Sequence, residues 1–132
     1  NIYLTAIGSS IESGDEGIVG RGNRINGLIS PSKPMSMEGS CGKNPVYYAG
    51  KLYYIEAEEI AQKIYKKFNL ANEVYIVSQV GRDLVDPWIV LVAIPEGTKN
   101  SEEEKIKELI TKELKEIPKI TDRILSEQFR LY

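Results

Sequence analysis

Histidine is absent from this chain of 132 residues, and cysteine occurs only once, as Cys41. Without histidine, these residues can form neither a Cys–His nucleophile nor a zinc site of mixed Cys and His ligands. A lone cysteine cannot form an internal disulfide, which fits a reducing compartment. We therefore expect a cytoplasmic protein.

Long apolar runs and long runs of one charge are also missing. No apolar stretch approaches the ~20 residues of a membrane-spanning helix, and no signal-peptide pattern is present. The net charge of −2 comes from 17 basic and 19 acidic residues. No segment forms a basic arm, so nucleic-acid binding through bulk electrostatics is disfavoured. The sequence also lacks the GxxxxGK(S/T) pattern of a phosphate-binding P-loop.

Glycine is concentrated in the first part of the chain, where nine of the eleven glycines lie between Gly8 and Gly50. Glycine in a regular element costs about 0.5–1 kcal/mol relative to alanine. This density therefore indicates sharp turns or a close approach of the backbone to a ligand. Backbone amides together with guanidinium and ammonium groups suit a polyanion, and a single carboxylate suits an amine or a metal ion. The charged residues that stand out among the glycines are Asp15, Arg21, Arg24 and Lys43.

Three motifs in a fixed order carry a family resemblance. The run GDEGIVGRGNRINGLISP (14–31), followed by PMSMEG (34–39) and GKNP (42–45), resembles the archaeal branch of S-adenosylmethionine synthetase (methionine adenosyltransferase). The resemblance implies synthesis of S-adenosylmethionine from L-methionine and ATP, with Mg²⁺ and K⁺ as cofactors. It also implies a homodimer with the active site between subunits. The chain would be the C-terminal portion of a longer, three-domain enzyme, and we expect it to be inactive alone.

The resemblance also implies roles for the four charged residues. Arg21 and Lys43 would stabilise the leaving triphosphate, and Asp15 would hold the amino group of methionine. Gly22 stands where the wider family often has lysine, so Arg24 is a candidate for that missing charge. The residues alone leave a structural alternative open. The basic side chains would only solvate a turn-rich loop, and Asp15 would close an Asx turn or cap a helix.

The GKNP motif departs from the wider family in two ways. Asn44 replaces the aspartate of the GKDP found in bacterial and eukaryotic members. Tyr47, Tyr48 and Ala49 stand where those members carry a second lysine and an acid. The metal ligands are therefore unassigned, and Lys51 is a candidate for the missing lysine.

The hydrophobic pattern predicts an α+β fold, a β-α-β-β-α-β two-layer sandwich with a long Gly-rich loop. Residues 88–94 are apolar at nearly every position, so we expect this strand to be buried on both faces. A capping box of Ser101 and Glu104 should begin the second helix, and Pro118 should end it. The expected elements are strand 2–7, helix 55–68, strand 74–80, a turn at 81–83, strand 88–94, helix 101–116 and strand 123–132.

The same pattern divides the chain into two parts. Residues 1–50 would hold the first strand and the Gly-rich active-site loop. Residues 51–132 would form the α-β-β-α-β remainder of the C-terminal domain. This division follows the glycine content and the start of helical periodicity.

A second class of function is also compatible with such a fold, namely a non-catalytic ligand- or RNA-binding module. An RNA-binding surface needs aromatic side chains among its basic residues. No Phe, Trp or Tyr occurs between Leu4 and Val46, which counts against this alternative. Calorimetry with a non-hydrolysable ATP analogue and with single-stranded RNA would separate the two functions.

Overall fold

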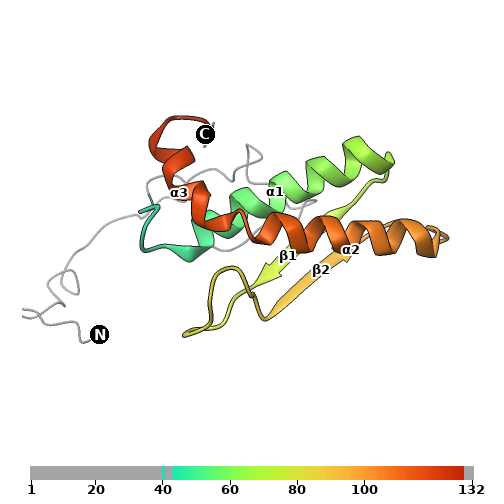
Figure 1. Cartoon of the computed structure of the whole chain (residues 1–132), viewed down its shortest axis with the longest axis horizontal. Helices are drawn as coiled ribbons and strands as arrows, with labels where there is room; N and C mark the ends of the chain where they lie inside the picture. The colour runs from blue at the N-terminus through green and yellow to red at the C-terminus, as the bar shows by residue number, and fades with distance from the viewer. Residues whose placement is uncertain (1–39, 41–42, 130–132) are drawn as a thin grey trace, which may run out of the picture.

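A computed structural model describes Ser40 and residues 43–129 of the chain (Figure 1). The expected strand 2–7 lies outside these residues. The two described strands form an antiparallel hairpin, in which Glu73 lies opposite Ala93 and Val77 lies opposite Ile89. The described elements are, in chain order, α1 (Ala49–Phe68), β1 (Glu73–Val77), β2 (Ile89–Ala93), α2 (Asn100–Leu114) and α3 (Ile117–Leu125).

Helix α1 is the longest of these elements, and both parts of the core are built on it. It begins at Ala49, earlier than the predicted start at residue 55, because Leu52 and Tyr53 extend the buried stripe by another turn. Asn69 ends the helix in a left-handed conformation (φ 54°), with its amide bonded to the carbonyl of Tyr65 at 2.8 Å, a common helix terminus. Neither α1 nor any other described helix is long and apolar enough to cross a membrane.

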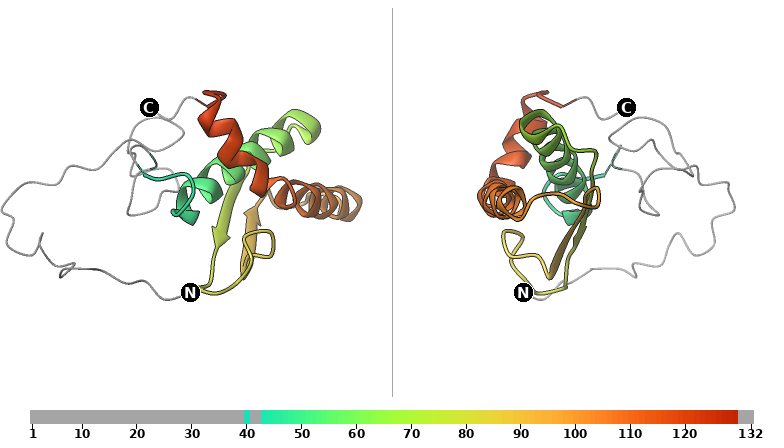
Figure 2. Two further views of the ribbon diagram at one scale, coloured as in Figure 1. Left: turned by 60° about the vertical axis from the view of Figure 1, so that its left-hand side comes forward. Right: turned by 90° about the vertical axis from the view of Figure 1, so that its right-hand side faces the viewer.

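The hairpin packs one face against the helices, as predicted for a sheet covered on one side. Val74 and Val92 lie against a cluster of Ile60, Ile64 and Ile106 from α1 and α2. Figure 2 shows the three helices on the same side of the hairpin.

The opposite face of the hairpin is exposed, which corrects one prediction. Tyr75 is 39% exposed and Leu91 is 57% exposed, and burial alternates along Ile89–Ala93. The expectation that this strand is buried on both faces is therefore wrong for the described part of the chain. The apolar run is real, but the described helices cover only one side of the sheet.

Helix α3 replaces the predicted last strand. Ile117 and Ile120 are fully buried against Leu52, Tyr53 and Ile55 of α1. Together with the partly buried Ile124, they follow helical spacing. The first turn of a helix tolerates proline, so Pro118 stands near the start of α3. The prediction of a strand over 123–132 is wrong for residues 123–129, and the described part is α+β with a closing helix.

The start of α2 also differs from the prediction. The N-cap residue is Lys99 rather than Ser101. The amide of Lys99 donates to the carboxylate of Glu102 at 3.4 Å, and the carbonyl of Lys99 accepts from the amides of Glu102 and Glu103. The capping box of Ser101 and Glu104 is therefore wrong. The lysine side chain has no acceptor atom, so only the glutamate half of such a box can form here.

A cluster of charged side chains lies where the three helices meet. Arg123 of α3 donates to both carboxylate oxygens of Glu59, at 3.0 and 2.5 Å, and Lys63 pairs with Glu113 of α2. Between them Glu56 is 0% exposed, and neither of its carboxyl oxygens has a hydrogen-bond partner among the described residues. The pKa of Glu56 is raised to about 7, mainly by burial and further by the nearby carboxylates of Glu59 and Glu113. The positive charges of Lys63 and Arg123 lower it.

Candidate functional site

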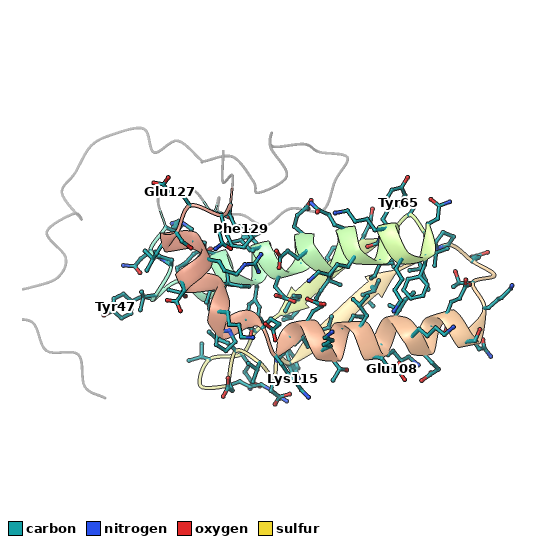
Figure 3. The ribbon with its side chains drawn as sticks, turned by 45° about the horizontal axis from the view of Figure 1, so that its top comes forward. Tyr47, Tyr65, Glu108, Lys115, Glu127 and Phe129 are labelled. Atoms are coloured by element: carbon teal, nitrogen blue, oxygen red, sulfur yellow. The ribbon has the colours of Figure 1, made fainter. Side chains whose placement is uncertain are left out.

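Lys43 is the single predicted site residue that falls within the described part of the chain. Asp15, Arg21 and Arg24 lie outside it. Lys43 opens the segment 43–48, here called the Lys43 loop, which leads directly into α1. Tyr47 of this loop projects outward at the end of the molecule where α1 begins, at the opposite end from Tyr65 (Figure 3).

Hydrogen bonds fix the backbone of Lys43 on both sides. Its amide donates to the carbonyl of Ser40 at 3.3 Å. Its carbonyl accepts from the ammonium Nζ of Lys51 at 2.7 Å, within the range of a charge-assisted hydrogen bond. The position of Lys43 is therefore set by two neighbouring segments and not by the loop alone.

Asn44 shapes the loop through its side chain. Its Oδ1 accepts from the amides of Val46 and Tyr47 at 2.7 and 3.2 Å, the pattern of an Asx turn. An aspartate would offer the same acceptor, so this turn can form in GKNP and GKDP alike. The signal for this turn in the sequence is the Asn44-Pro45 pair, because Asn-Pro favours turn initiation.

The aromatic ring of Tyr48 lies beside Lys43. The ammonium of Lys43 is 5.4 Å from the ring centroid, within the range of a cation–π interaction. Gly50 makes room for this ring, since a Cβ atom there would come within 2.7 Å of the Tyr48 Cζ. The first turn of α1 contains no acidic residue. The described loop therefore carries a lysine and leads into a helix start that favours anions.

Helix α3 also holds the loop. The hydroxyl of Thr121 donates to the carbonyl of Pro45 at 3.0 Å, across 76 positions of the sequence. The predicted elements leave residue 121 outside any helix or strand, so none of them pointed to this contact. The Lys43 loop is thus connected to both α1 and α3.

Replacing Thr121 by valine tests this connection. We expect Thr121→Val to lower the free energy of unfolding by about 0.5–1.5 kcal/mol, because the Pro45 carbonyl loses its donor while the side-chain shape is kept. Urea unfolding would measure the change. The matched control is Thr111→Val on α2, where the hydroxyl donates to the Lys107 carbonyl of its own exposed helix. Equal losses in the two variants would contradict a specific role for Thr121.

The described residues contain no cluster of acidic, cysteine or histidine side chains that could hold the metal ions implied by the resemblance. Nowhere in Ser40 and 43–129 do three or more Asp, Glu, Cys or His side chains gather to hold a metal ion. No described side chain is therefore assigned to Mg²⁺ or K⁺.

Comparison with known proteins agrees with this reading of the motifs. The family model of S-adenosylmethionine synthetase (AdoMet synthetase) matches residues 1–128. S-adenosylmethionine synthase of Pyrobaculum aerophilum is 46% identical over 134 residues, which cover 98% of this chain and 33% of the relative. The probable S-adenosylmethionine synthase of Aquifex aeolicus is 40% identical, with the same coverage. The enzyme of Archaeoglobus fulgidus is also 40% identical, over 99% of this chain and 34% of the relative.

Two facts follow from these comparisons. The chain spans about a third of the length of the relatives that it matches. The resemblance found in the glycine-rich motifs is confirmed along nearly the whole chain, which belongs to the S-adenosylmethionine synthetase family.

Proposed function

We propose that the protein to which this chain contributes synthesises S-adenosylmethionine from L-methionine and ATP, releasing phosphate and diphosphate. The observation that carries the proposal is the Lys43 loop. A motif lysine stands in the loop that leads into α1, with its backbone amide and carbonyl both hydrogen-bonded. The family membership of residues 1–128 supports the same reaction.

The proposed reaction depends on positioning the substrates and stabilising charge, and it needs no protein nucleophile. In the proposed reaction the sulfur of methionine attacks the 5′ carbon of ATP, and the C–O bond to the triphosphate breaks. Water then hydrolyses the released triphosphate to phosphate and diphosphate. Fixed cationic donors near the leaving oxygen stabilise the charge that develops there. We propose that Lys43 and Arg21 supply such donors, that Arg24 adds a further positive charge, and that Asp15 orients the ammonium of methionine.

The partners in this proposal are those that the family resemblance implied. Mg²⁺ would bind phosphate oxygens of ATP, K⁺ would be a second ion, and two copies of the protein would form a homodimer around the site. The described residues supply no metal ligand set. The proposal therefore assigns no described side chain to either ion.

A direct test compares two forms of the protein. We expect a protein of full family length that contains this chain to form S-adenosylmethionine. We expect no formation by the purified 132-residue chain, because it spans about a third of its relatives. Chromatographic detection of S-adenosylmethionine formed from methionine and ATP tests both expectations. Product formation by the short chain would refute its predicted inactivity, and a full-length protein without activity would refute the proposed function.

Substrate kinetics would test the roles of Asp15 and Arg21. We expect Asp15→Asn to raise the KM for methionine by about 10–150-fold, the value of one interaction with a charged group, and to leave the KM for ATP nearly unchanged. Arg21→Leu should instead lower kcat, because its partner gains charge only as the C–O bond breaks. Steady-state assays that vary each substrate in turn, with thermal melts alongside, would measure both. Equal changes in the two KM values that follow the loss of melting temperature would mean that these residues only shape the turn.

A further inference from the structure

Lys51 is a basic residue in an unfavourable place. It is 5% exposed, and burying an ammonium group costs free energy unless the charge is well compensated. It stands in the first turn of α1, where the helix dipole disfavours a positive charge. Among the described residues, no carboxylate lies close enough to Lys51 to form an ion pair.

The ammonium of Lys51 donates a hydrogen bond to a backbone carbonyl. Its Nζ donates to the carbonyl of Lys43 at 2.7 Å, across eight positions of the sequence. This hydrogen bond joins the first turn of α1 to the residue at which the Lys43 loop begins. With the Ser40 carbonyl on the other side of Lys43, it fixes the peptide planes from which the Lys43 side chain extends.

We infer that Lys51 is a positioning residue, whose buried ammonium holds the carbonyl of Lys43 and so sets where the Lys43 ammonium meets the substrate phosphates. The inference rests on the proposed function of Lys43. It goes beyond the expectation that Lys51 is a candidate for the missing second lysine of the family, because it assigns the ammonium to a backbone carbonyl. A misplacement of about 1 Å can cost on the order of 100-fold in rate, so a hydrogen bond to the backbone can matter for turnover.

A double-mutant cycle in a full-length synthetase that contains this chain tests the inference. The variants are Lys43→Met, Lys51→Met and the two together, with kcat and both KM values measured. We expect Lys51→Met to lower kcat by about 10-fold or more, the value of a hydrogen bond from a charged donor. In the Lys43→Met background, the same change should lower kcat less than twofold, since residues that act as one unit are non-additive.

The cycle separates the inference from the function on which it rests. If Lys43→Met lowers turnover strongly and Lys51→Met lowers it by the same factor in both backgrounds, Lys51 acts on its own. The inference then fails while the role of Lys43 stands. Unchanged turnover in Lys43→Met would overturn both. Unchanged turnover in Lys51→Met would overturn only the inference.

Two further measurements exclude a purely structural explanation. Lys63→Met is the matched control, because Lys63 is another lysine of α1, and it pairs with Glu113 far from the loop. A loss of turnover in Lys63→Met equal to that in Lys51→Met, with equal loss of melting temperature, would overturn the inference. If Lys51→Met does not fold, the cycle is repeated with Lys51→Arg, which keeps a charged donor but displaces it. A turnover defect that disappears in the Lys43→Met background supports positioning, and any other result overturns it.

Discussion

In a full-length synthetase that contains this chain, Lys43→Met should lower kcat by about 100- to 1,000-fold, or about 3–4 kcal/mol of transition-state stabilisation. The expected cause is the loss of a fixed cationic donor to the leaving triphosphate. Methionine is similar in length to lysine, so the packing of the loop should survive. The hydrogen bonds of the Lys43 backbone, from Lys51 and to Ser40, do not involve the side chain that is changed.

The structure offers a control with the same local contact. Lys67 lies 5.3 Å from the ring centroid of Phe68, much as Lys43 lies 5.4 Å from that of Tyr48. Lys67→Met therefore removes a comparable cation–π interaction, worth about 0.5–1 kcal/mol at an exposed site, but at the opposite end of α1. We expect its turnover to stay within a few-fold of the wild type.

Steady-state kinetics with saturating methionine and ATP, together with melting curves, would show whether the Lys43 side chain contributes to turnover. A turnover in Lys43→Met close to that of Lys67→Met would mean that Lys43 is a surface lysine. The alignment of GKNP with the family motif would then be wrong at this position.

The sequence predicted those elements whose signal is local. The apolar residues from Ala57 to Phe68 keep helical spacing throughout, and the helix predicted over 55–68 lies within α1. The β-hairpin also follows from two β-branched runs around a Gly81 turn, where the positive φ of 83° suits glycine. The alternating exposure of β2 could not be predicted, because it depends on which other segments cover the sheet.

The closing helix shows a different limit. A short apolar pattern near the C-terminus is ambiguous between strand and helix, and the spacing of Ile117, Ile120 and Ile124 favoured the helix that forms. The prediction places the end of the second helix at Pro118. In the first turn of a helix proline is equally acceptable, and α3 uses it there.

At the candidate site, the GKNP motif pointed to Lys43 but not to the residues that hold it. The partners of its loop come from Lys51, eight positions away, and through Pro45 from Thr121, 76 positions further along the chain. Asn44 was noted only as a departure from GKDP, whereas its side chain closes the turn. The contacts of Lys51 and Thr121 depend on how the helices pack, and no local pattern in the sequence encodes them. The Asn44 turn is local, and the Asn-Pro pair is its signal.

The buried carboxyl of Glu56 should make stability depend on pH in a direction opposite to that of an ion-paired acid. Its pKa is raised from the ordinary 4.5 to about 7 in the folded chain. Between these values the folded chain keeps a proton that the unfolded chain has lost, so stability falls as pH rises. The contribution is fully present below pH 4.5 and is lost as pH rises through about 7. A shift of this size corresponds to about 3 kcal/mol.

Glu56→Gln should remove this fall. The amide cannot ionise, and its N–H groups can donate to the carboxylates of Glu59 and Glu113, the charges that disfavour ionised Glu56. We expect the variant to be more stable than the wild type by a few kcal/mol at about pH 8, and the advantage to shrink toward about pH 4.5. Urea unfolding across this range would measure the difference between the two curves.

Glu58→Gln on the same helix is the matched control, because Glu58 is in contact with solvent and its carboxylate accepts a hydrogen bond from Gln62. This variant should keep the pH dependence of the wild type. Other acids titrate in the same range, so the informative quantity is the difference between each variant and the wild type at each pH. If Glu56→Gln changes stability by a constant amount at every pH, the carboxyl of Glu56 is ionised throughout the range. Lys63 and Arg123 would then compensate its charge more strongly than Glu59 and Glu113 oppose it.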